Sequence, residues 1–570
     1  MRIENVALTA DEHGASPSSP GADRHAQNAD RQIARMKSNY AIFDSYVAKA
    51  QKSLERGNLE TAGGYALMGA WVAAHMHCGF FASPRIERIL NKIGRQIPSS
   101  LPTTDRAGRP DQVKRVLHVS GEITAVGGLA TMLRRWIESD PGREHSVALT
   151  QQYDQPSALI TAAVSRAGGS IHLLSRAGGL AAKVTKLRQL ASEHDLIVLH
   201  IPNSDVVAPI AFAEPKRFPP VLFLNHSDHM FWIGSTISQV VGSMRKAALD
   251  ICEKRRYVEK KRSVLLPILV SPTARTKDRE AAKAALGLDP SALLLISVAR
   301  AQKYRTIGGV SYADTHSELL KRFPNALLMV VGGGERPDWA DASAAVGGRI
   351  QSLTPRDPKP YFEAADIYLD SFPFCSATSM MEAAGYGLPC VSRFVLPPEA
   401  RICGMDHPGL AGPLVESTND QDYIAGLERL MSDPKLRARI GEATEKSVLD
   451  ANVSPGWNKY LEAAVARALE LPPVDLEAIL SGDFTEKLNF GEPDTRLEDI
   501  YGFAPPQAAI LRHHLGLFPL SERLKLWIDV ARARAFLGWK DAVKGLFRES
   551  LVFKLKDTRA VALSVWRPSQ

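Results

Sequence analysis

Cysteine is scarce in this chain, with five among 570 residues. The five are scattered, without the close pairs that hold zinc or the density of a disulfide-stapled secreted domain; they are Cys78, Cys252, Cys375, Cys390 and Cys403. A run of about 18 apolar residues, the length of a membrane helix, is also missing. These absences exclude a disulfide scaffold and a transmembrane segment. They predict a cytoplasmic protein without a metal site.

Strong charge of one sign is missing too. The 70 Lys and Arg residues stand against 62 Asp and Glu, so the net charge of +8 is thin over a large surface. The densest basic runs are 253–257 and 260–262, and we interpret both as solvated helix faces. No nucleic-acid partner is therefore expected, although the mild excess is compatible with a small anionic substrate.

A complete dinucleotide-binding fingerprint is also absent. Gly127 and Gly128 follow an apolar strand and open a helix, where backbone N–H groups attract phosphate. The third glycine of the fingerprint would fall at Thr131, and the glycine run 332–334 leads into Pro337 instead. NAD is therefore not expected, and Gly127 with Gly128 forms either a phosphate-binding loop or a simple turn.

The two ends of the chain differ from its middle. Residues 1–30 are polar and rich in Ser, Pro, Ala and Asp, which predicts a flexible lead without a signal peptide. Residues 31–100 place Ile42 and Tyr46 at helical spacing and predict a helical hairpin or bundle. It resembles a tetratricopeptide pair in outline, but no fixed repeat follows, which favours a packing or self-association element. Residues 454–570 predict a C-terminal helical appendage.

Between these ends, apolar strands alternate with helical segments in two successive cycles. The alternation predicts an α/β fold with two Rossmann-like domains facing a cleft, over residues 112–268 and 271–453. We expect the chemistry in loops beyond the carboxyl ends of the strands. The predicted strands are 115–120, 146–149, 196–200 and 221–224 in the first domain, and 293–298, 326–331, 367–370 and 389–392 in the second.

Histidines follow two of the strands in the first domain. His200 ends one strand, where it can bind a sugar or phosphate oxygen, act as a base, or cap the strand structurally. His226 and His229 follow another strand, with Asp228 between them and an aromatic flank after them. This pattern favours a polar substrate-binding cluster over a metal pair. Either histidine can be the general base, and Asp228 can orient either ring.

Cations cluster at the end of the first strand in the second domain. They lie where a departing diphosphate would develop negative charge, so we expect them to stabilise it. The alternative is a surface charge cluster. The three cations are Arg300, Lys303 and Arg305.

A loop rich in hydroxyl side chains follows a later strand of the second domain. Ser376, Thr378 and Ser379 stand where a helix is expected to begin, and can offer hydroxyl and N–H groups to phosphate. Glu382 lies one turn into that helix and can accept both hydroxyls of a ribose. The sequence therefore predicts a donor-diphosphate site between Ser371 and Pro389.

The run from Glu382 to Pro389 is similar to the donor-site signature of the large retaining family of GT-B glycosyltransferases. In that family the glutamate binds the nucleotide ribose. The resemblance covers about residues 114–465, and it implies a metal-independent transferase with no cofactor that uses a nucleotide-diphosphate sugar as co-substrate. Arg300 with Lys303 or Arg305 resembles the family's basic pair on the phosphates, 200–203 its sugar-facing His-x-Pro-Asn segment, and Gly127–Gly128 its glycine pair.

Phe374 departs from that family, which carries an acidic residue eight positions before the ribose glutamate. The hydroxyl-rich segment 376–379 and the N-terminal helices instead resemble the inverting O-GlcNAc transferase and bacterial protein N-glycosyltransferase group. Retaining and inverting chemistry both stay open, as do the nucleotide base, the sugar and the acceptor, which can be a protein, a glycan or a lipid-linked molecule. The alternatives to a transferase are a catalytically silent GT-B scaffold or binding module and an epimerase of the same fold. Self-association through the helical regions is a further expectation.

Overall fold

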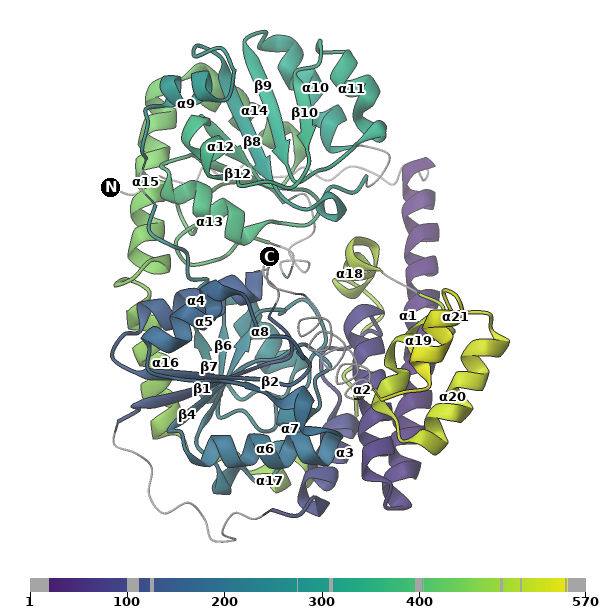
Figure 1. The fold of residues 1–570 in the computed structure, drawn as a ribbon. Helices are drawn as coiled ribbons and strands as arrows, with labels where there is room; N and C mark the ends of the chain where they lie inside the picture. Colours follow the sequence, from purple (N-terminus) through teal and green to yellow (C-terminus); the bar gives the residue numbers. More distant parts are fainter. Residues whose placement is uncertain are drawn as a thin grey trace, which may run out of the picture.

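The computed structural model describes most of the chain, namely residues 20–99, 112–123, 128–273, 275–306, 311–394, 402, 404–481, 485–502, 505–548 and 551. Two parallel β-sheets lie one above the other in Figure 1, with a layer of helices beside them. That layer combines the purple N-terminal helices with the yellow C-terminal ones. The predicted α/β fold with two Rossmann-like units is therefore confirmed.

The first sheet has seven parallel strands within the described residues. β1 pairs with both β2 and β4, so that Ser120 lies opposite Leu149 on one side and His200 on the other. Every residue of β4 is buried, as expected for a parallel strand with helices on both faces. The strands in spatial order are β3 (Ile171–Leu173), β2 (Glu144–Leu149), β1 (Arg115–Ser120), β4 (Leu196–His200), β5 (Val221–Asn225), β6 (Val240–Ser243) and β7 (Ser263–Leu265).

Five α-helices connect these strands within the described residues. α4 begins at Gly128, directly after the loop that follows β1, so its N-terminus faces the carboxyl edge of the sheet. The five helices are α4 (Gly128–Ser139), α5 (Ala158–Arg166), α6 (Leu180–Ser192), α7 (Val207–Ala211) and α8 (Lys246–Arg255).

The second sheet has six parallel strands among the described residues. β8 and β9 pair along their whole length, from Leu293 opposite Ala326 to Val298 opposite Val331. The spatial order is β10 (Ile350–Leu353), β9 (Ala326–Val331), β8 (Leu293–Val298), β11 (Ile367–Leu369), β12 (Cys390–Arg393) and β13 (Val415–Ser417). The α-helices of this unit are α9 (Arg279–Ala285), α10 (Tyr312–Arg322), α11 (Ala340–Ala344), α12 (Lys359–Ala364), α13 (Ala377–Gly385), α14 (Asp420–Ser432) and α15 (Pro434–Asn452).

The sequence led us to expect a single helical appendage from residue 454 onward. In the structure this segment is instead divided between two parts of the molecule. α16 (Asn458–Glu470) returns to the first sheet, where its apolar face packs against Val198 and Leu222. Trp457 just ahead of it is fully buried and donates to the Pro267 carbonyl at 2.8 Å. This helix therefore belongs to the core of the first domain.

The remaining C-terminal helices pack on the N-terminal ones, and the two ends of the chain share one apolar core. Phe518 lies against Tyr65, with ring centroids 5.0 Å apart, and a Cβ on Gly64 would come within 2.8 Å of the Phe518 ring. The helices of this layer are α1 (Pro20–Glu55), α2 (Leu59–His75), α3 (Pro84–Gln96), α18 (Asp494–Tyr501), α19 (Gln507–His514), α20 (Leu520–Arg532) and α21 (Trp539–Gly545), whereas α17 (Leu476–Ser481) is drawn beneath α6 in Figure 1.

The N-terminal boundary also differs from the prediction. The structure has helix α1 from Pro20, inside the segment expected to be a flexible lead, and residues 1–19 lie outside the described part. α3 then packs so closely on the first domain that a Cβ on Gly94 would lie 2.3 Å from the Ile210 carbonyl oxygen. Arg188 donates to the carbonyls of Gly94 and Ile97 at 2.7 and 2.9 Å, which fastens this helix to the sheet unit.

Candidate functional site

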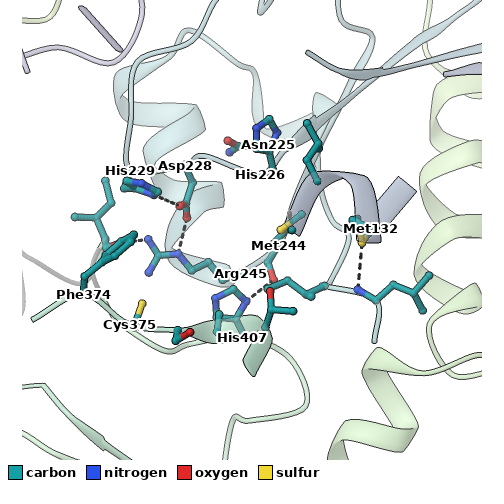
Figure 2. A pocket seen from close by; sticks show the side chains of 18 of the residues that line it. Met132, Asn225, His226, Asp228, His229, Met244, Arg245, Phe374, Cys375 and His407 are labelled. Atoms are coloured by element: carbon teal, nitrogen blue, oxygen red, sulfur yellow. Dashed lines mark hydrogen bonds and ion pairs between the residues drawn. The ribbon is translucent and has the colours of Figure 1, made fainter. Parts of the chain in front are cut away.

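A cavity of about 280 Å³ lies between the two sheet units, at the carboxyl ends of their strands (Figure 2). This edge is where open α/β sheets bind ligands. Its lining comes from the start of α4, the loops after β5, β6 and β8, and the loop that leads into α13. The lining residues are Gly128, Leu129, Met132, Arg135, Asn225, His226, Asp228, His229, Met244, Arg245, Ile268, Leu269, Lys303, Phe374, Cys375, Ser376, Ala377, Thr378, Ile402 and His407.

Asp370 shapes the loop that leads into α13. Its carboxylate accepts from the backbone N–H groups of Ser371 and Ser376, each at 2.8 Å. Burial raises the pKa of Asp370 to about 6, although the Ser376 N–H and Lys303 oppose the rise. The buried carboxyl therefore folds the loop so that the N-terminus of α13 faces the cavity.

The predicted hydroxyl residues lie at that N-terminus. Ser376 occupies the N-cap position of α13, and its hydroxyl donates to the Ser379 hydroxyl at 3.2 Å and accepts from no backbone N–H in the described first turn of the helix. Ser376 and Thr378 line the cavity, whereas Ser379 is half-buried one position further along the helix. Free N–H groups and a positive helix end make this the natural place for an anionic group.

Lys303 is the one predicted cation of the loop after β8 that lines the cavity. Its ammonium donates to the Cys375 carbonyl at 2.8 Å and lies 4.4 Å from the centroid of the Phe374 ring. Burial lowers the pKa of Lys303, opposed by Cys375 and Asp370. With three N–H donors, the ammonium keeps donors for a ligand oxygen.

The other two predicted cations are placed elsewhere. Arg300 is exposed and is not part of the cavity lining. Arg305 is also exposed and donates to the Ile500 carbonyl of α18 at 2.7 Å, because the loop after β8 runs alongside that helix. Of the three predicted cations, the structure therefore brings only Lys303 to the cavity lining, and a donor contact by Arg300 or Arg305 stays a prediction.

Glu382 lies near the middle of α13 and is half-buried. One of its carboxylate oxygens accepts from Arg135 of α4 at 2.5 Å, across the boundary between the two sheet units. Arg135 also donates to the Ser271 hydroxyl at 3.0 Å and the Leu269 carbonyl at 3.2 Å. The second carboxylate oxygen of Glu382 accepts no hydrogen bond from the described part of the chain, which leaves it able to accept from a ligand hydroxyl.

Asp228 and His229 form a carboxylate–imidazole pair on the opposite wall, drawn in Figure 2. The His229 Nδ1 lies 3.5 Å from Asp228, and Asp228 also accepts from Arg245 Nε at 2.5 Å. Burial raises the pKa of Asp228, but Arg245 and His229 outweigh it and hold that pKa below its ordinary range. Burial lowers the pKa of His229, so the ring is neutral at pH 7 and can accept a proton.

His226 lines the same wall without a carboxylate partner. Its Nδ1 lies 3.3 Å from the Leu224 carbonyl, and because a carbonyl can only accept, this contact favours the tautomer with the proton on Nδ1. Burial lowers the pKa of His226, which favours the neutral ring. Asp228 therefore orients His229, whereas His226 is oriented by the backbone.

His200 does not line the cavity. It is fully buried at the end of β4, and its Nε2 is 3.0 Å from Nδ1 of His118. The other ring nitrogen of His118, Nε2, lies 2.9 Å from Nδ1 of His145. Burial, helped by His226, lowers the pKa of His200 to about 3. A direct catalytic role for His200 is not supported, because three histidines on neighbouring strands pack together inside the sheet unit.

The structure describes only the second residue of the predicted glycine pair. Gly127 lies outside the described residues, and Gly128 lines the cavity at the first turn of α4. A Cβ on Gly128 would meet no atom within 4 Å, so the space beside it is open to a ligand. Within the described residues, no group of three or more His, Cys, Asp or Glu side chains could hold a metal ion.

Two arginines of the site were not found from the sequence. Arg135 and Arg245 belong to segments that carry no motif, and each reaches the site through a contact with a residue distant in sequence. Arg245 is buried and donates to the Gly404 carbonyl at 2.7 Å as well as to Asp228. Arg245 could have been found from its position just after the end of β6, but the sequence analysis did not predict that strand.

Residues 278–447 match the family model of Glycosyl transferases group 1. Two curated relatives are D-inositol 3-phosphate glycosyltransferases. The one from Corynebacterium aurimucosum is 32% identical over 203 residues, covering 31% of this chain and 45% of the relative. The one from Rhodococcus opacus is 29% identical over 191 residues, covering 30% and 40%. The chain thus spans less than half the length of these relatives.

Several solved structures are similar to the chain. A Thermobaculum terrenum O-GlcNAc transferase has a TM-score of 0.45 at 17% identity, covering 76% of this chain and 84% of that one. A Rickettsia africae glycosyltransferase has a TM-score of 0.47 at 11% identity, covering 62% and 98%. Anabaena HepE, solved with UDP and glucose, has a TM-score of 0.45 at 13% identity, covering 62% and 100%.

The two facing sheet units and the cavity between them define a GT-B arrangement. Within it, residues 278–447 are the segment that matches the glycosyl transferases group 1 model. The resemblance recognised at Glu382–Pro389 is thereby confirmed, since that run lies inside the matched segment. No helix in the described part of the chain is both long and apolar enough to cross a membrane.

Proposed function

We propose that the chain is a glycosyltransferase that moves a sugar from a nucleotide-diphosphate sugar to an acceptor. One observation carries the proposal: Lys303 and the N-terminus of α13 line a single inter-domain cavity, and Glu382 of the same helix pairs with Arg135, which lines that cavity too. The first two suit a diphosphate and the third suits a ribose. The family match over 278–447 supports the same reading.

In the proposed mechanism the protein stabilises the leaving group without a metal or other cofactor. Lys303 and the positive end of α13 attract the charge that develops on the departing diphosphate. Both are held in place before the reaction, by the Cys375 carbonyl and by Asp370 respectively, so little reorganisation is needed. Metal independence is part of the proposal.

We further propose inverting stereochemistry, with His229 as the general base. Its ring is neutral, is paired with Asp228, and faces Phe374 with ring centroids 5.6 Å apart. Phe374 stands at the position where the retaining family carries a carboxylate, so an acidic contact with the sugar is missing there. The anomeric configuration of the product, read by proton NMR, tests this step; a retained configuration contradicts it.

The first experiment is a thermal-shift screen of nucleotide sugars, because a donor that binds the folded state raises its melting temperature. The donor that stabilises the chain is then used in an assay for slow release of free sugar. Lys303→Ala should lower that rate about 100-fold to 1000-fold, the usual effect of losing one preorganised donor to developing charge. Glu382→Ala should weaken donor binding.

Lys321→Ala is the matched control, since Lys321 is exposed on α10 and pairs with the neighbouring Glu318 of the same helix. It should leave both the melting shift and the hydrolysis rate unchanged. If calorimetry finds no nucleotide sugar that binds, the proposal fails and a silent scaffold becomes the better account. The cytoplasm is the compartment we propose, because the cysteines are scattered through the chain.

A further inference from the structure

A second cavity, of about 560 Å³, opens between the helical layer and the first sheet unit. Its floor is formed by the loops after β2 and β4, and its roof by α2 and the end of α19. Three parts of the chain that are far apart in sequence therefore build it. The volume is in the range of pockets that enclose a small ligand.

The roof is an aromatic surface. Trp71 stacks on His75, with ring centroids 4.3 Å apart and planes 20° apart, and His514 meets Trp71 edge-on at 5.9 Å. Burial lowers the pKa of His75, and lowers that of His514 to about 3, so both rings are neutral at pH 7. An uncharged aromatic wall attracts the polarised C–H groups on the flat face of a sugar ring.

The floor offers hydrogen-bonding groups. Glu122, Gln151 and Asp154 are exposed on the loops after β1 and β2, and present amide and carboxylate groups that pair with hydroxyls. An aromatic roof over a polar floor matches a polyhydroxylated ligand.

The charges of this cavity are balanced. At its rim Arg548 pairs with Glu60 at 2.8 Å, and within it Lys183 donates to the Thr150 carbonyl at 2.8 Å. Acidic residues are present beside these cations, so neither sign dominates the lining. A neutral ligand is therefore favoured over a phosphate or a strongly charged chain.

The second cavity shares a sheet edge with the candidate donor cavity. The loop after β1 contributes Glu122 to the second cavity, and the helix that follows this loop contributes Gly128 to the first. A molecule seated in the second cavity can thus extend along the carboxyl edge toward His226 and His229. We propose that this second cavity binds a neutral hexose-containing segment of the acceptor, a role that rests on the proposed transferase function.

A peptide ligand fits the cavity less well. Peptides that add to a sheet need an exposed edge strand, and the described edges of this sheet are β3 and β7. The strands whose loops form the floor, β2 and β4, are each paired on both sides. A peptide therefore cannot bind at this floor by strand addition.

The test is saturation-transfer NMR of the full chain with three neutral tetrasaccharides, maltotetraose, cellotetraose and chitotetraose. At least one should bind, and Trp71→Ala should weaken its binding about tenfold or more, as the loss of a central aromatic contact does. Trp539→Ala is the matched control, because Trp539 is 74% exposed on α21 and outside the cavity. It should bind as the native chain does.

Gln151→Ala provides a second variant that cannot unfold the core, since Gln151 is exposed. It should also weaken tetrasaccharide binding. The inference is overturned if none of the three tetrasaccharides binds, or if Trp71→Ala and Gln151→Ala both bind as the native chain does. Hydrolysis of the nucleotide sugar should persist in Trp71→Ala. If the native chain hydrolyses no donor yet binds a tetrasaccharide through Trp71, the carbohydrate site stands and its acceptor role falls with the proposed function.

Discussion

Glu382 shows how a single side chain can belong to a motif and to a contact that the motif does not reveal. Its spacing to Pro389 identified the family, whereas the structure adds an ion pair with Arg135 on the other sheet unit. The two side chains are 24% and 11% exposed, so the pair is only partly hydrated. Such a pair ties the two units together at the edge of the cavity.

We expect Arg135→Ala to destabilise the fold. Removing the guanidinium leaves the half-buried Glu382 carboxylate without its cation, which should lower the free energy of unfolding by about 1–3 kcal/mol. Arg134→Ala is the matched control, because Arg134 lies on the same helix and pairs with Glu138 near the surface. Urea unfolding of the three proteins checks the prediction, and equal losses for the two variants would contradict it.

The raised pKa of Asp370 leads to a prediction about how the free energy of unfolding depends on pH. Its pKa rises from 3.8 to about 6 on folding, so the native state binds more protons than the unfolded state between those values. The free energy of unfolding should therefore fall as pH rises through this window. Asp370→Asn keeps an acceptor oxygen for the N–H groups of Ser371 and Ser376 but cannot titrate.

The two proteins are to be compared by urea unfolding at several pH values across that window. Relative to the native chain, Asp370→Asn should gain stability as pH rises, by up to about 3 kcal/mol, since each pKa unit corresponds to about 1.4 kcal/mol. The whole gain should appear between the unfolded and folded pKa values of Asp370. Parallel pH profiles for the two proteins would show that the carboxyl does not titrate in this window.

Among the helices, α16 shows that a sequence can predict where a helix lies in the chain without predicting what the helix packs against. Its apolar spacing predicted a helix, and the structure has one at Asn458–Glu470. Its partner was not predictable, because the strands it covers lie far back in the chain, at Leu222 and Val240. A helical pattern states which face is buried but not against what.

Trp457→Ala should therefore destabilise the first domain rather than a separate appendage. Trp457 is fully buried, lies 5.4 Å from the Trp136 ring and donates to the Pro267 carbonyl. The loss should be about 3–5 kcal/mol, the usual range for a buried Trp. Lys459→Ala, an exposed neighbour, should stay within about 0.5 kcal/mol of the native chain. Chemical denaturation measures both, and a small loss for Trp457→Ala would argue against this packing.

The strands show the same division. The long apolar runs, such as Leu293–Val298 and Ala326–Val331, were predicted with the bounds that the structure has. The missed strands are short or carry polar residues, for instance β7 with three residues and β6 ending in Gly242 and Ser243. These strands form because neighbouring strands pair with them, and no local pattern records that pairing.

Across the whole molecule, the two ends of the chain stabilise each other. Phe518 near the C-terminus packs on Tyr65, and Tyr65 donates to the Glu522 carboxylate at 2.5 Å. Deleting residues 1–96 would uncover this shared core together with the surface of α6 and α7. We therefore expect the deleted protein to aggregate on expression, as judged by size-exclusion chromatography.

Phe518→Ala tests the same shared core with a smaller change than the deletion. It should cost about 3–5 kcal/mol and speed amide exchange in α2 as well as in α20, because the two helices share that core. Leu537→Ala, at a side chain that is 81% exposed, should change neither. A soluble monomer lacking residues 1–96, with native circular dichroism in its remaining part, would show that the ends are independent.

The sequence alone specified the longer strands of both sheets, the start of α13 and the donor motif at Glu382, because each rests on the spacing of neighbouring residues. The pairing of Arg135 with Glu382 joins residues 247 apart, and the second cavity joins α2, the loop after β2 and α19. The burial of His200 and the contact of Arg305 with α18 also follow from packing between distant segments. Such contacts depend on how folded units meet, which is a property of the whole tertiary arrangement.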